Sequence, residues 1–173
     1  MTQIANKVTG ASFSRGSSKQ DYATPSDLRA AIVEKFGFPC FDLAADETNF
    51  FGPSNRFYTE EVDALAQDWS SISARIVDKG TLFLNPPFGN IEPWAKKCHE
   101  EALKGARILF LVPASVGSVW YSKHVHGTAT HVFFLSPRVC FDGKGPFPKD
   151  IILACYGLDS SNSTTAYHCW RWK

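Results

Sequence analysis

The hydrophobic positions of this chain form helical stripes separated by short continuous apolar runs. Apolar side chains recur every four residues at Leu28, Ile32 and Phe36, which predicts a helix over residues 24–37. Thr24 is expected as its N-cap, with Pro25 in the first turn. A second helical pattern opens at proline 93 and runs to about residue 104, and a short helix is expected over residues 118–125.

Continuous apolar runs of four to seven residues predict the strands. We expect buried strands over residues 40–45, 81–84 and 106–112, and further strands over residues 130–135, 138–141 and 150–156. Short strands are also expected at residues 56–59 and 65–68. Strands and helices alternate early and strands crowd together later, which predicts an α/β fold with a mostly parallel central sheet and an antiparallel edge.

Composition places the chain among globular proteins of ordinary size. It has 173 residues, 44% of them hydrophobic, and a net charge of +1. We expect a flexible leader over residues 1–20, rich in Ser and Gly, and a single domain over residues 21–173. The five cysteines form no Cys-x-x-Cys pair, so we expect reduced thiols, no metal site and a cytoplasmic protein without a membrane segment.

The segment after the strand at residues 81–84 carries the clearest chemistry, in the sequence Asn85-Pro86-Pro87-Phe88. Ligands bind at the carboxyl ends of strands in open α/β sheets. The side-chain oxygen of Asn85 and the carbonyl of Pro86 can accept both hydrogens of an exocyclic amine and draw its lone pair back onto nitrogen. Phe88 offers a face on which a planar base stacks. This arrangement favours methylation of an amino group on a base.

The order of motifs along the chain resembles the phage-type Dam DNA adenine N6-methyltransferases over roughly residues 20–157. The pieces that carry the resemblance are Asp21-Tyr22-Ala23-Thr24-Pro25, Phe41-Asp42-Leu43-Ala44-Ala45, Leu65-Ala66-Gln67-Asp68-Trp69, Asn85-Pro86-Pro87-Phe88-Gly89, Leu111-Val112-Pro113-Ala114 with Trp120, and Phe147-Pro148. The resemblance implies a Rossmann-like methyltransferase fold, S-adenosyl-L-methionine as cofactor and double-stranded DNA as partner. It further implies that adenine is flipped into the site, in the cytoplasm of a bacterial host.

The same resemblance assigns expected cofactor contacts. Asp42 in the first strand is expected near the methionine ammonium, or is a paired structural carboxylate. Thr24 and Pro25 match the leading segment that packs beside the methionine group. Ala44 stands where many methyltransferases carry glycine, which makes close approach of the cofactor to the backbone less free.

The remaining cofactor and DNA contacts have open alternatives. Asp68 is expected to accept a hydrogen bond from the cofactor adenine, or it caps a helix. Glu60 is expected at the ribose hydroxyls, with Asp63 as the competing candidate. Arg138 and Lys144 are expected to contact DNA, the alternatives being a surface ion pair for Arg138 and a plain surface lysine at 144.

Two other functions remain open from the sequence alone. The same motif suits an amino-methyltransferase that acts on RNA bases or on a protein glutamine. A catalytically inactive nucleic-acid-binding protein is the alternative that is not an enzyme, and an intact Asn85 and Phe88 argue against it. Nothing in the sequence indicates the oligomeric state.

Overall fold

The computed structural model describes residues 22–48, 50–75, 80–158 and 164–173, and its centre is one six-stranded sheet. The strands are β1 (Phe41–Asp42), β2 (Thr81–Leu84), β3 (Arg107–Pro113), β4 (His131–Ser136), β5 (Ile151–Tyr156) and β6 (Ala166–Arg171). Their order across the sheet is β1-β2-β3-β5-β4-β6. The expected flexible leader, residues 1–20, lies outside the described residues.

Strand direction confirms the expected α/β class with a mixed, mostly parallel sheet. β1, β2 and β3 pair in parallel, and β4 and β6 pair in parallel. β5 runs against both of its neighbours, β3 and β4. The antiparallel strand therefore lies inside the sheet rather than at its edge, because β4 and β6 extend the sheet beyond it.

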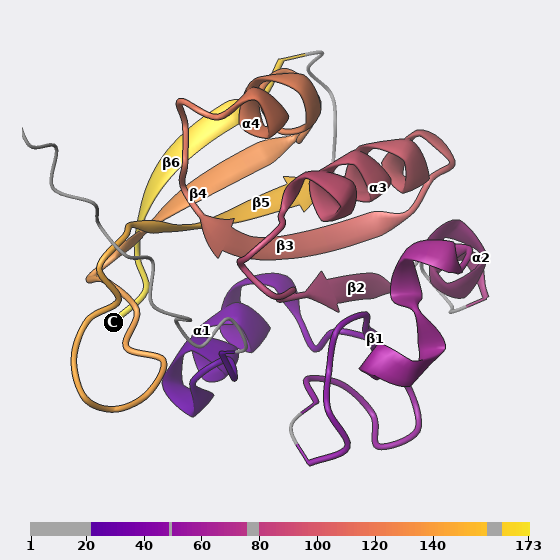
Figure 1. Cartoon of the computed structure of the whole chain (residues 1–173), viewed down its shortest axis with the longest axis horizontal. Helices are drawn as coiled ribbons and strands as arrows, with labels where there is room; N and C mark the ends of the chain where they lie inside the picture. Colours follow the sequence, from indigo (N-terminus) through magenta and orange to yellow (C-terminus); the bar gives the residue numbers. More distant parts are fainter. Residues whose placement is uncertain (1–21, 49, 76–79, 159–163) are drawn as a thin grey trace, which may run out of the picture.

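Helices cover both faces of the sheet (Figure 1). They are α1 (Ser26–Phe36), α2 (Trp69–Ala74), α3 (Glu92–Leu103) and α4 (Val119–His124), with short 3₁₀ helices η1 (Glu60–Val62) and η2 (Ala64–Ala66). Successive strand residues point to opposite faces. Thus Phe83 and Leu109 pack in one cluster with Leu28 of α1, while Leu82 and Ile108 pack in the other with residues of α2, α3 and α4.

Several expected elements are confirmed with small changes of boundary. The helices expected over residues 24–37, 93–104 and 118–125 are α1, α3 and α4, and the strand expected over residues 81–84 is β2. The first strand is shorter than expected. Residues 56–59 contribute only a bridge between Phe57 and Asp42, outside the named strands.

Three local predictions are wrong, and one strand was missed. Residues 65–68 are not a strand, because the chain winds into η2 and Asp68 then caps α2. Residues 138–141 form no strand among the described residues. No strand was expected at β6, yet it pairs with β4 along its whole length. Thr24 does not cap α1, since the residue before the helix is Pro25 and the Thr24 hydroxyl is used elsewhere.

Within the described part of the chain, no helix combines the length and the apolar character needed to cross a membrane.

Candidate active site

The candidate site lies at the carboxyl end of β2. Asn85 directly follows the strand, Pro86 is buried, and the chain then turns through Gly89 and Asn90 into α3. Proline lacks an N–H group, so the two prolines after Asn85 end the hydrogen-bonded ladder and fix the direction of the backbone. The neighbouring parallel strands β1 and β3 end on the same side of the sheet.

The carboxamide of Asn85 is held on one side only. Its Nδ2 donates to the carbonyl oxygen of Tyr22 at 2.6 Å and to Oγ1 of Thr24 at 3.1 Å. Its Oδ1 is buried from solvent and has no hydrogen-bond partner. A buried acceptor without a donor is costly, which makes this oxygen a place where a ligand donor would be stabilised.

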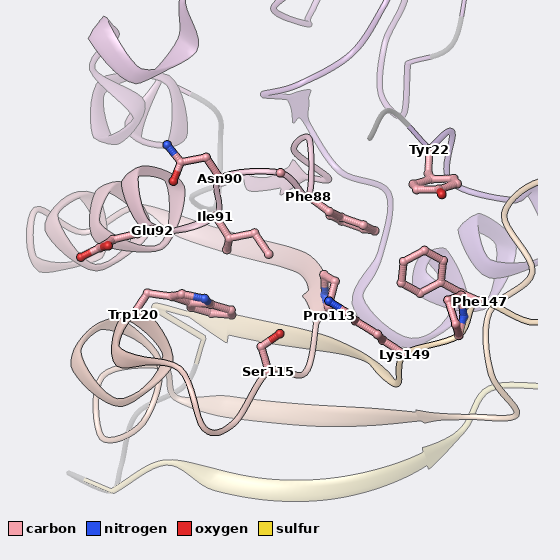
Figure 2. A pocket seen from close by; sticks show the side chains of 12 residues that line it. Tyr22, Phe88, Asn90, Ile91, Glu92, Pro113, Ser115, Trp120, Phe147 and Lys149 are labelled. Carbon is pink, nitrogen blue, oxygen red and sulfur yellow. The ribbon is translucent and has the colours of Figure 1, made fainter. Parts of the chain in front are cut away.

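A pocket of about 460 Å³ opens beside this turn. Figure 2 shows the rings of Tyr22, Phe88 and Phe147 at one side of it, and Trp120 and Glu92 at the other. The other lining residues come from the turn after β2, the end of β3 and the β4–β5 loop: Gly89, Asn90, Ile91, Pro113, Ser115, Pro148 and Lys149. The volume lies within the range of small-molecule sites.

Four aromatic rings pack against one another, and three of them, Tyr22, Phe88 and Phe147, line the pocket. Phe88 lies 5.9 Å from Tyr22, 5.9 Å from Phe141 and 5.7 Å from Phe147, measured between ring centroids. Tyr22 also lies 5.3 Å from both Phe141 and Phe147. Such tilted and edge-to-face pairs hold a ring in place. Phe88 is therefore a fixed aromatic wall of the pocket.

The end of β1 presents Asp42, which is 4% exposed. Oδ1 accepts from the N–H of Ala44 at 3.1 Å, and Oδ2 accepts from the N–H of Phe51 at 2.8 Å. Burial raises the pKa of Asp42 to about 6, against the lowering effect of these two backbone bonds. Asp42 thus has a structural role within its loop, and each oxygen keeps a lone pair for a further donor.

The residues expected at the ribose and the adenine of the cofactor lie after β1 in the chain and are exposed. Asp68 is the N-cap of α2, and hydrogen bonds from the Ser70 and Ser71 hydroxyls and the Ser71 N–H hold the pKa of its carboxyl well below its usual range. The alternative that Asp68 caps a helix is confirmed. Glu60 is exposed in η1, and Asp63 follows with a left-handed backbone, φ 46°.

The two expected DNA contacts differ in their pairing. Arg138 forms a surface ion pair with Asp150 at 2.9 Å, which was the alternative expected for it. It also donates to the carbonyl oxygen of Pro148 at 3.4 Å. Lys144 is exposed in the same loop, between β4 and β5. This loop reaches the pocket through Phe147 and Lys149.

Sequence reasoning gave no role to several residues that line the pocket. Tyr22, Pro113 and Phe147 stand inside the quoted motifs, but only their place in the motif marked them. Ser115 and Lys149 carried no local signal. These residues stand on segments far apart in the chain, and only the tertiary fold brings them to one pocket.

Two comparisons with known proteins agree with one another. The model of the protein family described as DNA N-6-adenine-methyltransferase (Dam) matches residues 12–161 of the chain. A protein of Escherichia phage T1, named DNA N-6-adenine-methyltransferase, is 26% identical over 102 residues. That similarity covers 59% of this chain and 39% of the phage T1 protein, so the chain matches well under half of that relative's length.

Proposed function

The chain belongs to the DNA N-6-adenine-methyltransferase (Dam) family, and from that premise we propose that it transfers a methyl group from S-adenosyl-L-methionine to the N6 amino group of adenine in double-stranded DNA. The family is one of adenine-specific DNA methyltransferases, and such enzymes imply this cofactor and a DNA substrate.

The observation that carries the proposal is the unpartnered Oδ1 of Asn85. The amino nitrogen of adenine shares its lone pair with the ring and is a weak nucleophile. Asn85 accepts one amino hydrogen and the carbonyl of Pro86 accepts the other, so that electron density returns to nitrogen as the new bond forms. Acceptors fixed in advance at a developing positive charge lower the barrier without reorganisation.

The pocket walls support the proposal that the adenine leaves the duplex. The amino group cannot reach Asn85 while the base is stacked in the helix. Phe88 provides a face for the extruded ring, and stacking of this kind contributes about 1–3 kcal/mol per base. Pro87 follows the buried Pro86, and its fixed φ restricts the backbone that leads into Phe88.

S-adenosyl-L-methionine would supply an electrophilic methyl group on its sulfonium sulfur. The lone pairs that remain on Asp42 at the end of β1 fit the ammonium group of its methionine part. We assign Thr24, Pro25, Asp42 and Ala44 to its methionine part. Glu60, with Asp63 as the competing residue, is assigned to the ribose, and Asp68 to the adenine.

The β4–β5 loop is the proposed DNA contact. Lys144 is exposed at its tip and Arg138 at its base, and both offer positive charge to phosphate groups. Asp150 already neutralises part of the charge of Arg138, so Lys144 is expected to contribute more.

The test is methyl transfer from cofactor labelled with tritium on its methyl group. The wild-type protein is incubated with duplex DNA, RNA and protein extract, and labelled nucleosides are identified by mass spectrometry. We expect label in N6-methyladenine from DNA. Label only in RNA or in glutamine would replace the proposed substrate with one of the alternatives. Cofactor binding by calorimetry without any transfer would favour the inactive nucleic-acid-binding protein.

A further inference from the structure

We propose that the Tyr22 carbonyl and the Thr24 hydroxyl form a clamp that fixes which end of the Asn85 carboxamide meets the substrate, so that Tyr22 and Thr24 are positioning residues of the reaction. This inference rests on the proposed function, because it explains how the acceptor used there is kept in place. Both contacts come from a segment that stands ahead of α1 and far from β2 in the sequence.

The orientation of the amide follows from the chemistry of its partners. A backbone carbonyl can only accept, so the group 2.6 Å from the Tyr22 oxygen must be the amide nitrogen. Thr24 is 6% exposed, and its hydroxyl accepts from the same nitrogen at 3.1 Å. Both hydrogens of the nitrogen then have acceptors, and Oδ1 is turned away from the clamp.

The clamp matters because the two ends of a carboxamide are nearly equal in shape and opposite in hydrogen bonding. Rotated by half a turn, Asn85 would present an NH2 group to the amino group of adenine, and two donors would face one another. With the clamp in place Oδ1 is the end of the amide that is left free, and this buried oxygen has no hydrogen-bond partner.

The same geometry requires an amide at position 85. In Asn85→Asp a carboxylate oxygen would lie against the Tyr22 carbonyl oxygen, at the place where the amide nitrogen now lies 2.6 Å away. Two acceptors at that separation repel one another. The carboxylate still has an oxygen for the substrate, so a loss of rate in this variant reports on the clamp rather than on the missing acceptor.

The clamp can be tested without any turnover, by NMR of protein labelled with ¹⁵N at asparagine. The variant Asn85→Ala assigns the side-chain signal of Asn85. We expect its two amide protons to exchange with water far more slowly than those of Asn55 and Asn90, which are exposed. In Thr24→Val one proton loses its acceptor, and its signal is expected to shift. Exchange as fast as that of Asn90 would overturn the clamp.

Kinetics of methyl transfer to a DNA duplex then measure the consequence. We expect kcat to fall about tenfold in Thr24→Val and to recover in Thr24→Ser, which keeps the hydroxyl. Asn85→Asp is expected to lose on the order of a hundredfold in kcat. Wild-type kcat in both Thr24→Val and Asn85→Asp would refute the positioning role.

A matched control removes a threonine hydroxyl elsewhere. The Thr130 hydroxyl donates to the Cys155 carbonyl at 3.0 Å, away from the pocket, so Thr130→Val should lower thermal stability to a similar degree and leave kcat unchanged. A parallel fall in kcat there would attribute the Thr24 effect to folding and refute the clamp. The proposed function fails separately, if the wild-type protein labels no DNA while the NMR signature of the clamp is present.

Discussion

Two polar side chains of this protein differ in how fully their hydrogen-bonding groups are satisfied. Glu101 of α3 is fully buried, and its carboxylate accepts from Lys97 at 2.9 Å, Lys104 at 2.8 Å and the N–H of Ser70 at 2.9 Å. Asn85 at the end of β2 has both amide hydrogens bonded and its oxygen left without a partner. The satisfied carboxylate joins α2 to α3 and stabilises the fold. The unsatisfied oxygen of Asn85 is the acceptor to which we assign the amino group of the substrate.

Removal of the Asn85 side chain should give the largest effect on activity. Asn85→Ala is expected to reduce kcat by about 10²–10³-fold or more, because the transition state loses a fixed acceptor. Cofactor affinity measured by calorimetry should remain, and the free energy of unfolding should change by only about 1 kcal/mol. Loss of cofactor binding in this variant would contradict the assignment of Asn85 to the substrate rather than to the cofactor.

Glu101→Ala should show the converse pattern, with a loss of stability and no loss of kcat. Burial raises the pKa of Glu101, but hydrogen bonds from Lys104 and Lys97 outweigh it and leave the pKa below its ordinary value. The variant leaves these groups unpaired, and urea unfolding should detect a loss of about 2–4 kcal/mol.

Glu100→Ala on the same helix is the control for Glu101. Glu100 lies 3.7 Å from Lys96 on the surface, and half of its side chain is exposed. Its loss should therefore cost less than about 0.5 kcal/mol. Equal losses in the two variants would show that burial of the Glu101 carboxylate is not what stabilises the α2–α3 contact.

Asp42 is a third polar side chain, and its burial should make the free energy of unfolding depend on pH. With its pKa raised to about 6 from 3.8, the folded protein binds a proton between pH 4 and 6 that the unfolded chain does not. The free energy of unfolding therefore falls as pH rises across this window and levels off above it, by about 3 kcal/mol for a shift of this size. In Asp42→Asn the contribution should vanish. An unchanged difference between wild type and variant from pH 4 to 6.5 would contradict it.

Phe88 and Phe141 sharpen the comparison within one aromatic cluster. Both contact Tyr22 and Phe147, but only Phe88 lines the pocket. Phe88→Ala and Phe141→Ala should destabilise the fold alike. Only Phe88→Ala should also weaken binding of a duplex with an unpaired target adenine, by about 1–3 kcal/mol in a titration. Equal losses of duplex binding in Phe88→Ala and Phe141→Ala would show that the base does not stack on Phe88.

The sequence predicted those parts of the molecule whose causes are local. The stripe Leu28, Ile32 and Phe36 fixes α1, and the prolines after Asn85 end β2 wherever the chain folds. β6 was missed because an edge strand with Tyr167 and Arg171 on its open face has the polar composition of a tail. Its identity depends on β4, about 35 residues away.

Some residues of the candidate site could be predicted and others could not, again because only some of them depend on local sequence. Asn85 and Phe88 could be predicted from the motif, since the residues that define it are adjacent in the sequence. The contact of Asn85 with Tyr22 joins positions 63 residues apart, and no local pattern encodes it. Asp68 stayed ambiguous because a carboxylate before Trp69 and two serines suits both a cap and a ligand, and the cap is present.

The reversed direction of β5 has a consequence for how related chains diverge. β4 ends and β5 begins on the side of the sheet where β2 and β3 end, so the hairpin connecting them, residues 137–150, hangs over the pocket. Insertions or deletions in a hairpin loop leave the register of both strands intact. A change in the length or charge of this loop can thus reshape one wall of the pocket while the sheet beneath it stays the same.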